Sequence, residues 1–112
     1  MLFDVVVTST GRWAVVSVTG ELDVATAPRL RQEAVRLVSG GQVDVILDLG
    51  GVDFLDSTGL GVIIGILKRV RSHGGELVVV GLAPRVRKVF EMTRVIEILP
   101  TFDTVEHAVA GV

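Results

Sequence analysis

The residues best suited to chemistry stand at one junction, Asp56-Ser57-Thr58-Gly59, between a strand-like run and a helix-like run. Aspartate and serine are favoured at the start of a helix, where the side chain accepts a hydrogen bond from a backbone N–H. The hydroxyl of Ser57 is therefore expected beside unpaired N–H groups and the positive end of a helix dipole. Such surroundings stabilise a phosphoryl group. A helix cap with no further role is the alternative that these residues alone leave open.

A serine on a strand-to-helix turn is also the nucleophile of α/β-hydrolases, where it lies in a G-x-S-x-G turn. Here Leu55 replaces the first glycine, which makes room for the tight turn. A nucleophilic serine also needs a general base within hydrogen-bonding reach. His73 lies at the far end of the same predicted helix, roughly 24 Å from Ser57 at the usual helical rise, and His107 falls in a short final helix. The sequence therefore favours a non-enzymatic role over a small hydrolase.

Three carboxylates, those of Asp48, Asp53 and Asp56, lie around the end of the strand-like run. Such a group could hold Mg²⁺, but the neighbouring residues are apolar and Asp56 is explained as a helix cap, so no metal is expected. No phosphate-binding glycine loop of the G-x-x-x-x-G-K-[ST] or G-x-G-x-x-G type occurs at a strand–helix junction, so no cofactor is expected. Inside the following helix, we expect Gly65 to pack internally and Gly59 to be more open.

The elements on either side of Ser57 must place it at the open end of a sheet. An apolar run rich in β-branched residues, 43–49, predicts a buried strand before it. A helix after it is indicated by apolar residues at i, i+3, i+4, i+7 and i+10, namely Leu60, Ile63, Ile64, Leu67 and Val70. This helix is expected to end at residues 73–75, where two glycines follow a histidine.

The rest of the chain also alternates between strands and helices. Residues 3–8 and 13–19 are β-rich runs joined by a short turn, which predicts a hairpin. A helix with Thr26 as its N-cap is expected next, with a buried face made of Ala27, Leu30, Ala34, Leu37 and Val38. The later elements are predicted as a strand at 76–80, a helix opened by Pro84, a strand at 96–99 and a last helix with Asp103 and Glu106 as a capping box. This order implies a largely parallel sheet.

Composition limits the class of protein. The chain has 112 residues, 49% of them hydrophobic and 21% charged, and is expected to form one domain over residues 1–112. A net charge of −2 at pH 7 argues against nucleic acid as a partner. The central uncharged stretch, 57–67, is shorter than the roughly 20 residues that span a bilayer, so no membrane partner is expected. The absence of cysteine excludes thiol chemistry and is compatible with the cytoplasmic location that we expect.

Two segments carry a resemblance to a known family. Asp56-Ser57-Thr58-Gly59-Leu60-Gly61 after an apolar strand resembles the phosphoacceptor segment of bacterial anti-sigma factor antagonists, the stand-alone STAS domains. Gly20-Glu21-Leu22-Asp23-Val24-Ala25-Thr26-Ala27 is similar to the second conserved segment of that family, the loop before its first helix. The resemblance covers nearly the whole chain. It implies an α/β fold with an N-terminal β-hairpin, then alternating strands and helices, and a mixed sheet with helices mainly on one side.

The resemblance also implies a function. Family members bind an anti-sigma factor while unphosphorylated and so release a sigma factor; the anti-sigma factor is usually a serine kinase of the histidine-kinase-like ATPase class. That kinase phosphorylates the serine and breaks the complex, and a PP2C-type phosphatase restores it. Carried over, Ser57 is the acceptor, although the residues themselves leave Thr58 open. The implied docking surface consists of Gly20, Glu21, Asp23, Thr26, Asp56, Thr58 and Gly59. The alternative is a STAS interaction module of a transport or stress-sensing assembly.

Overall fold

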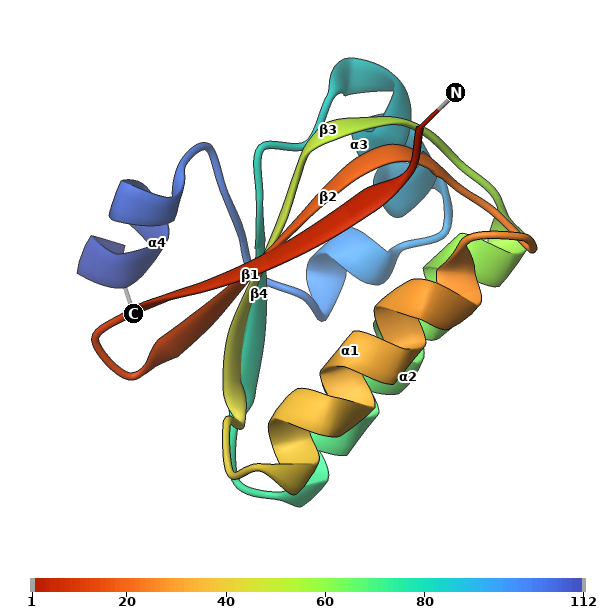
Figure 1. Cartoon of the computed structure of the whole chain (residues 1–112). Coiled ribbons are helices and arrows are strands. Elements are labelled where there is room, and N and C mark those ends of the chain that lie inside the picture. The colour runs from red at the N-terminus through yellow and green to blue at the C-terminus, as the bar shows by residue number, and fades with distance from the viewer. Residues whose placement is uncertain (1, 112) are drawn as a thin grey trace.

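Five strands form one mixed sheet in the order β1-β2-β3-β4-β5 in this computed structural model, which describes residues 2–111 (Figure 1). The strands are β1 (Asp4–Thr10), β2 (Trp13–Leu22), β3 (Asp44–Leu55), β4 (Glu76–Val80) and β5 (Thr101–Phe102). β1 pairs antiparallel with β2, and each later pair is parallel. The predicted hairpin is confirmed, and its turn contains Gly11 with a φ of 57°, a left-handed conformation that glycine adopts readily.

The helices lie mainly on one face of this sheet, as predicted (Figure 1). They are α1 (Ala27–Ser39), α2 (Ser57–Ser72), α3 (Pro84–Met92), the 3₁₀ turn η1 (Val95–Glu97) and α4 (Val105–Gly111). α1, α2 and α3 share one large apolar core with the sheet. α4 covers a smaller cluster on the opposite face, where Ala108 packs against side chains that include Trp13 and Ile46. No helix within residues 2–111 is both long and apolar enough to cross a membrane.

The buried faces of the two long helices follow their periodicity closely. All five residues predicted to be buried in α1 are buried. In α2, Leu60, Ile63, Leu67 and Val70 are buried as predicted, but Ile66 is buried where Ile64 was expected. The difference arises because α2 packs beside α1 as well as on the sheet, so its buried arc turns toward the neighbouring helix.

β3 is longer than the predicted strand at 43–49 and carries the chain up to the residue before Asp56. Its pairing with β2 shifts register between Ser17, opposite Asp48, and Thr19, opposite Gly51. Asp48 Oδ1 accepts a hydrogen bond from the Gly50 N–H at 2.9 Å at this irregularity. A β-bulge of this kind lets a strand bend and continue, so the two glycines redirect β3 instead of ending it.

The predicted strand at 96–99 is wrong. Residues 95–97 form η1 and a turn follows at 98–99, and the fifth strand lies later, where Val79 and Val80 of β4 pair with Thr101 and Phe102. Val95 and Leu99 are both buried, and the Leu99 N–H donates to the Val95 carbonyl at 3.1 Å. A spacing of four residues buries two side chains from a helical turn, and the short apolar run could not be distinguished from a strand by its composition.

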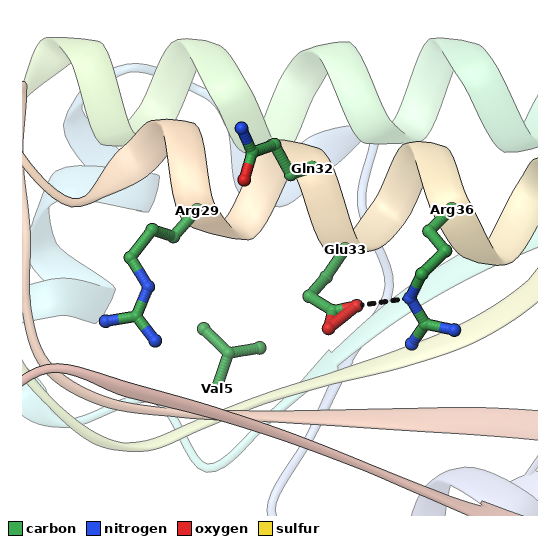
Figure 2. A pocket seen from close by; sticks show the side chains of 5 residues that line it. All are labelled: Val5, Arg29, Gln32, Glu33 and Arg36. Carbon is green, nitrogen blue, oxygen red and sulfur yellow. Dashed lines mark hydrogen bonds and ion pairs between the residues drawn. The ribbon is translucent and has the colours of Figure 1, made fainter.

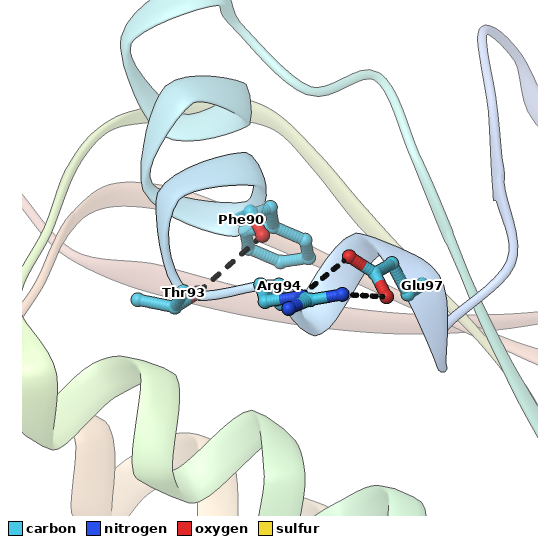
Figure 3. A network of polar contacts seen from close by, with 4 residues as sticks. All are labelled: Phe90, Thr93, Arg94 and Glu97. Carbon is cyan, nitrogen blue, oxygen red and sulfur yellow. Dashed lines mark hydrogen bonds and ion pairs between the residues drawn. The ribbon is translucent and has the colours of Figure 1, made fainter.

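A left-handed residue turns the chain between α3 and η1 (Figure 3). Arg94 has a φ of 65°, which is unusual for a residue other than glycine. Its guanidinium donates two hydrogen bonds to Glu97, at 2.9 and 3.2 Å. The Thr93 hydroxyl donates back to the Val89 carbonyl at 2.7 Å and so closes the end of α3. These contacts hold the turn that places Val95 in the core.

The last helix begins one residue later than its capping box predicts. Thr104, and not Asp103, caps α4, because the Thr104 Oγ1 accepts the His107 N–H at 3.1 Å. The Ala108 N–H donates to the Thr104 carbonyl at 3.1 Å and continues the first turn. The short helix is thus fixed so that Ala108 reaches the sheet.

Candidate functional site

The two segments that carry the family resemblance, 20–27 and 56–61, meet at the end of the sheet where β2 and β3 finish (Figure 1). Leu22 pairs with Leu55 as the last residues of the two parallel strands. The Asp56 N–H then donates to the Leu22 carbonyl at 3.2 Å, one step beyond the strand pairing. The loop before α1 and the start of α2 therefore form one surface, here called the sheet tip and made of residues 20–26 and 53–59.

Asp56 caps α2, as predicted, and leaves Ser57 at its first position. The Asp56 carboxylate accepts a hydrogen bond from the Gly59 N–H at 2.9 Å. Ser57 and Thr58 are both exposed, and within residues 2–111 neither side chain makes a hydrogen bond to another residue. Asp56 is thus used by the helix, whereas the Ser57 hydroxyl remains accessible at the positive end of α2.

Gly59 holds the two halves of the sheet tip together. A Cβ atom there would lie 2.5 Å from the backbone oxygen of Leu22 and 2.7 Å from a methyl group of Leu55. At Gly65, by contrast, a Cβ would meet nothing within 4 Å. The prediction that Gly59 is the more open glycine and Gly65 the packed one is therefore wrong. Gly59 is buried and can affect a docking surface only by allowing α2 to approach β2 closely.

The loop before α1 is fixed by hydrogen bonds that centre on Thr26. Its hydroxyl donates to the Glu21 carbonyl at 2.6 Å and accepts the Asp23 N–H at 2.9 Å. The Asp23 carboxylate accepts the N–H groups of Ala25 and Thr26 at 2.9 and 3.2 Å. Thr26 occupies the predicted N-cap position but makes no side-chain bond to the helix. Its hydroxyl instead ties the start of the loop to its end.

Gly20 is a buried residue of the sheet tip whose role is to allow a close approach between backbone segments. It is buried, and its φ of 108° lies in the region that glycine favours. A Cβ there would lie 2.7 Å from the Leu2 carbonyl oxygen and 3.2 Å from the Phe3 α-carbon. Of the residues that the resemblance placed on the docking surface, Gly20 and Gly59 are therefore internal, and the other five lie wholly or partly exposed.

We predict that Thr26→Val lowers the free energy of unfolding by about 1–2 kcal/mol, because two hydrogen bonds lose their shared partner without a large change in volume. Urea unfolding followed by circular dichroism measures the change. Thr58→Val is the matched control, since an exposed threonine outside such a network is expected to change stability by no more than about 0.5 kcal/mol. Equal stability of Thr26→Val and wild type would contradict a structural role for this hydroxyl.

The charges at the sheet tip are all of one sign. Glu21, Asp23, Asp53 and Asp56 belong to it, and its two segments contain neither lysine nor arginine. The N-terminal ends of α1 and α2, where the helix dipoles are positive, are thus the sources of positive potential in its backbone. A neutral hydroxyl is compatible with these surroundings, and a doubly charged phosphate adds repulsion from four carboxylates.

Groups needed for hydrolysis or metal binding are not gathered at the sheet tip. His73 caps the opposite end of α2, and His107 lies in α4. Asp48 accepts from Gly50 in the middle of β3, away from Asp56, so the three aspartates do not converge. Within residues 2–111, no group of three histidine, cysteine, aspartate or glutamate side chains could hold a metal ion. What the site offers chemically is an accessible hydroxyl on a rigid edge.

A hollow of about 250 Å³ elsewhere on the surface lies between α1 and β1 (Figure 2). Its arginines are already engaged. Arg36 pairs with Glu33 at 2.8 Å, and Arg29 donates to the Phe3 carbonyl at 3.1 Å while its guanidinium lies 5.1 Å from the centre of the Phe3 ring. Arg29 thereby holds the segment before β1 against α1. The polar side chains that line the hollow are thus used in contacts between α1 and the segment around β1.

Two exposed apolar residues at the sheet tip were not singled out from the sequence. Val24, in the loop before α1, is 69% exposed, and Phe54, near the end of β3, is 42% exposed. The signal was present in principle, because each interrupts a segment that is otherwise acidic, small or buried. Exposure depends on the fold, however, and the neighbouring Leu22 and Leu55 are buried.

Comparison with known proteins gives a consistent result. The family described as "STAS domain" matches residues 4–108. The anti-sigma-B factor antagonist of Staphylococcus aureus is 34% identical over 93 residues, which cover 83% of this chain and 86% of that protein. BtrV of Bordetella bronchiseptica, named as a candidate anti-sigma factor antagonist, is 38% identical over 82% of this chain and 79% of its own length. The crystal structure of an anti-sigma factor antagonist from Mycobacterium paratuberculosis superposes with a TM-score of 0.89, at 29% identity, over 99% of this chain and 94% of that chain.

Proposed function

This chain belongs to the STAS domain family, and we propose that it is an anti-sigma factor antagonist switched by phosphorylation of Ser57. Unphosphorylated, it binds an anti-sigma factor of the histidine-kinase-like ATPase class and so frees a sigma factor. The same ATPase phosphorylates Ser57, the complex dissociates, and a PP2C-type phosphatase regenerates the active form. The names of its relatives support the antagonist role.

The observation that carries the proposal is the position of the Ser57 hydroxyl. It is exposed at the first residue of α2, and the Asp56–Leu22 hydrogen bond holds it beside the loop before α1. A kinase needs an accessible hydroxyl, and a docking surface that is already ordered binds its partner at a lower entropic cost. The Thr26 and Asp23 hydrogen bonds supply that rigidity on the neighbouring loop. Glu21, Asp23, Thr26, Asp56 and Thr58 form the proposed docking surface around Ser57.

Phosphorylation acts on the complex more than on the fold. A phosphate adds about −1.5 to −2 charges at neutral pH, and the N-terminus of α2 stabilises such a charge by roughly 0.3–1 kcal/mol. A partner surface that packs directly against a neutral hydroxyl leaves the phosphate without a counter-ion at the point of contact. Leaving one charge buried and unpaired in an interface weakens binding by about 2–5 kcal/mol. The balance favours dissociation of an otherwise unchanged domain.

The test is recovery and modification of a partner. Wild-type protein is used as bait in lysate of the source organism, and captured proteins are identified by mass spectrometry. We expect an ATPase of the anti-sigma class, which, once purified and supplied with ATP, transfers phosphate to Ser57. Ser57→Ala should abolish incorporation, and Thr58→Ala should retain it. Capture of no such ATPase would overturn the proposed function, and phosphate on Thr58 would overturn the assignment of the acceptor.

A further inference from the structure

Exposed apolar side chains gather at the sheet tip. Seven large hydrophobic residues are exposed within residues 2–111; two of them belong to the sheet tip, and a third, Leu2, lies beside it next to Gly20. Leu2 is 88%, Val24 69% and Phe54 42% exposed. Single exposed apolar residues are ordinary on protein surfaces, but several that share one small area indicate a site of interaction.

The strand register places two of these side chains in one row. Glu21 of β2 pairs with Phe54 of β3. On the other side, Asp4 pairs with Thr19, so continuing this antiparallel register by two residues sets Leu2 opposite Glu21. Residues directly opposite on neighbouring strands point to the same face of a sheet. Leu2 and Phe54 thus flank Glu21 on the face away from α1 and α2, since Leu22 and Leu55 turn into the core on the helix side.

Two further contacts hold the row in place. Leu2, Glu21 and Asp23 line a common hollow of about 230 Å³, so the segment before β1 lies against the loop before α1. Arg29 binds the Phe3 carbonyl and stacks over its ring, which fixes the residue next to Leu2. Both observations place the backbone around Leu2 beside the sheet tip.

The apolar row, which we define as Leu2, Phe54 and the neighbouring Val24, is close to Ser57. Phe54 precedes Ser57 by three residues, and an extended chain spans at most about 3.6 Å per residue, so the two α-carbons are separated by no more than about 11 Å. Val24 follows Leu22 by two residues, and Leu22 is bonded directly to Asp56. All three apolar side chains and the acceptor hydroxyl therefore fit inside one interface of ordinary size, about 800 Å² on each partner.

The charges around the row select the kind of occupant. Glu21, Asp23, Asp53 and Asp56 belong to the same two segments as Val24 and Phe54, and these segments contain no basic residue. A second copy of this chain would bring the same carboxylates together, and like charges in contact oppose association. A partner surface with an apolar centre and a basic rim is complementary both to the apolar side chains and to the carboxylates.

We propose, on the basis of the proposed function, that the interface with the anti-sigma ATPase extends beyond Ser57 to Val24, Phe54 and Leu2. The ATPase contacts these three side chains with an apolar patch of its own that is bordered by lysine or arginine. Burial of these side chains supplies affinity that does not depend on the state of Ser57. The serine then acts as the switch within an interface that the apolar row anchors. Aromatic residues enclosed by a polar rim are common anchors of protein interfaces, and Phe54 is the aromatic member of the three.

The test uses purified ATPase captured by wild type and measures Kd by calorimetry. Phe54→Ser and Val24→Ser are each expected to weaken binding at least about tenfold, because the apolar side chain that the partner would bury is replaced by a polar one. Val109→Ser is the matched control. The exposed fraction of Val109, 39%, is nearly that of Phe54, but Val109 lies in α4 and lines a hollow with Thr8, Ser9 and Thr10, at the far end of β1 from Leu2, so this variant should bind within twofold of wild type. Circular dichroism and thermal unfolding verify that each variant is folded.

The possible outcomes separate this inference from the proposed function. If Phe54→Ser and Val24→Ser both bind within twofold of wild type, the apolar row is not an anchor, and the inference fails while the antagonist role stands. Affinity that is unchanged between 50 and 500 mM salt would contradict the basic rim, since screening weakens contacts between exposed charges. Dimerisation of the free wild-type chain that Phe54→Ser abolishes would assign the row to a second copy. If wild type binds no ATPase, the proposed function and this inference fall together.

Discussion

Ser57→Asp is expected to weaken binding of the anti-sigma ATPase at least about hundredfold, which corresponds to roughly 2.8 kcal/mol. The carboxylate would enter a surface that already holds four acidic residues and would meet a partner shaped around a neutral hydroxyl. The fold is expected to be unaffected, because Ser57 is exposed at the first turn of α2, where an acidic residue is stabilised by about 0.3–1 kcal/mol. Calorimetric titration of the purified partner measures the change.

Two variants make this prediction specific. Ser57→Ala removes the acceptor without adding charge and should bind within about threefold of wild type, because truncating most interface side chains costs little. Thermal unfolding of Ser57→Asp should give a midpoint at or slightly above that of wild type, which excludes misfolding as the cause of lost binding. Equal affinities of the Asp, Ala and wild-type proteins would reduce Ser57 to a helix residue with no part in a switch.

Gly59→Ala is expected to lower the free energy of unfolding by at least about 2 kcal/mol, although alanine is the better helix former by about 1 kcal/mol. The added methyl group would lie 2.5 Å from the Leu22 carbonyl oxygen, a backbone atom that cannot move alone. α2 or β2 must shift, and overpacking of this kind costs about 1–3 kcal/mol or more. Urea unfolding followed by circular dichroism gives the free energy directly.

Gly65→Ala is the matched control, with the opposite sign. It lies in the same helix, is exposed, and has no atom within 4 Å of an added Cβ. Without a clash, alanine should raise the free energy of unfolding by about 1 kcal/mol through its helix propensity. A Gly59→Ala protein as stable as Gly65→Ala would show that α2 does not rest on Leu22 as closely as the structure has it.

The effect of Gly59→Ala should also reach the sheet tip. Leu22 accepts the Asp56 N–H and precedes the loop that Thr26 closes, so a displaced α2 changes the distance between that loop and Ser57. We therefore expect the fraction of the Gly59→Ala protein that remains folded to bind the partner more weakly than wild type does. This links a buried glycine to the docking surface through geometry alone.

Local features of the sequence predicted much of the framework. The buried face of α1, the hairpin and the capping of α2 by Asp56 all follow from periodicity or from contacts between residues a few positions apart. The errors are also informative. Residues 96–99 form an apolar run too short to show whether its period is that of a strand or of a helical turn. β3 continued past 49 because glycines can redirect a strand as well as end one.

The sequence by itself determined that Ser57 begins a helix after a buried strand, because this depends on neighbours within one or two turns. The tertiary structure decided what surrounds it. The contact of Gly59 with Leu22, the use of the Thr26 hydroxyl by its own loop, and the alignment of Leu2 with Phe54 across β2 join residues from different elements. Packing and strand register are properties of the whole sheet. They could be seen once the strands were paired, whereas the sequence carries only the local preferences of each segment.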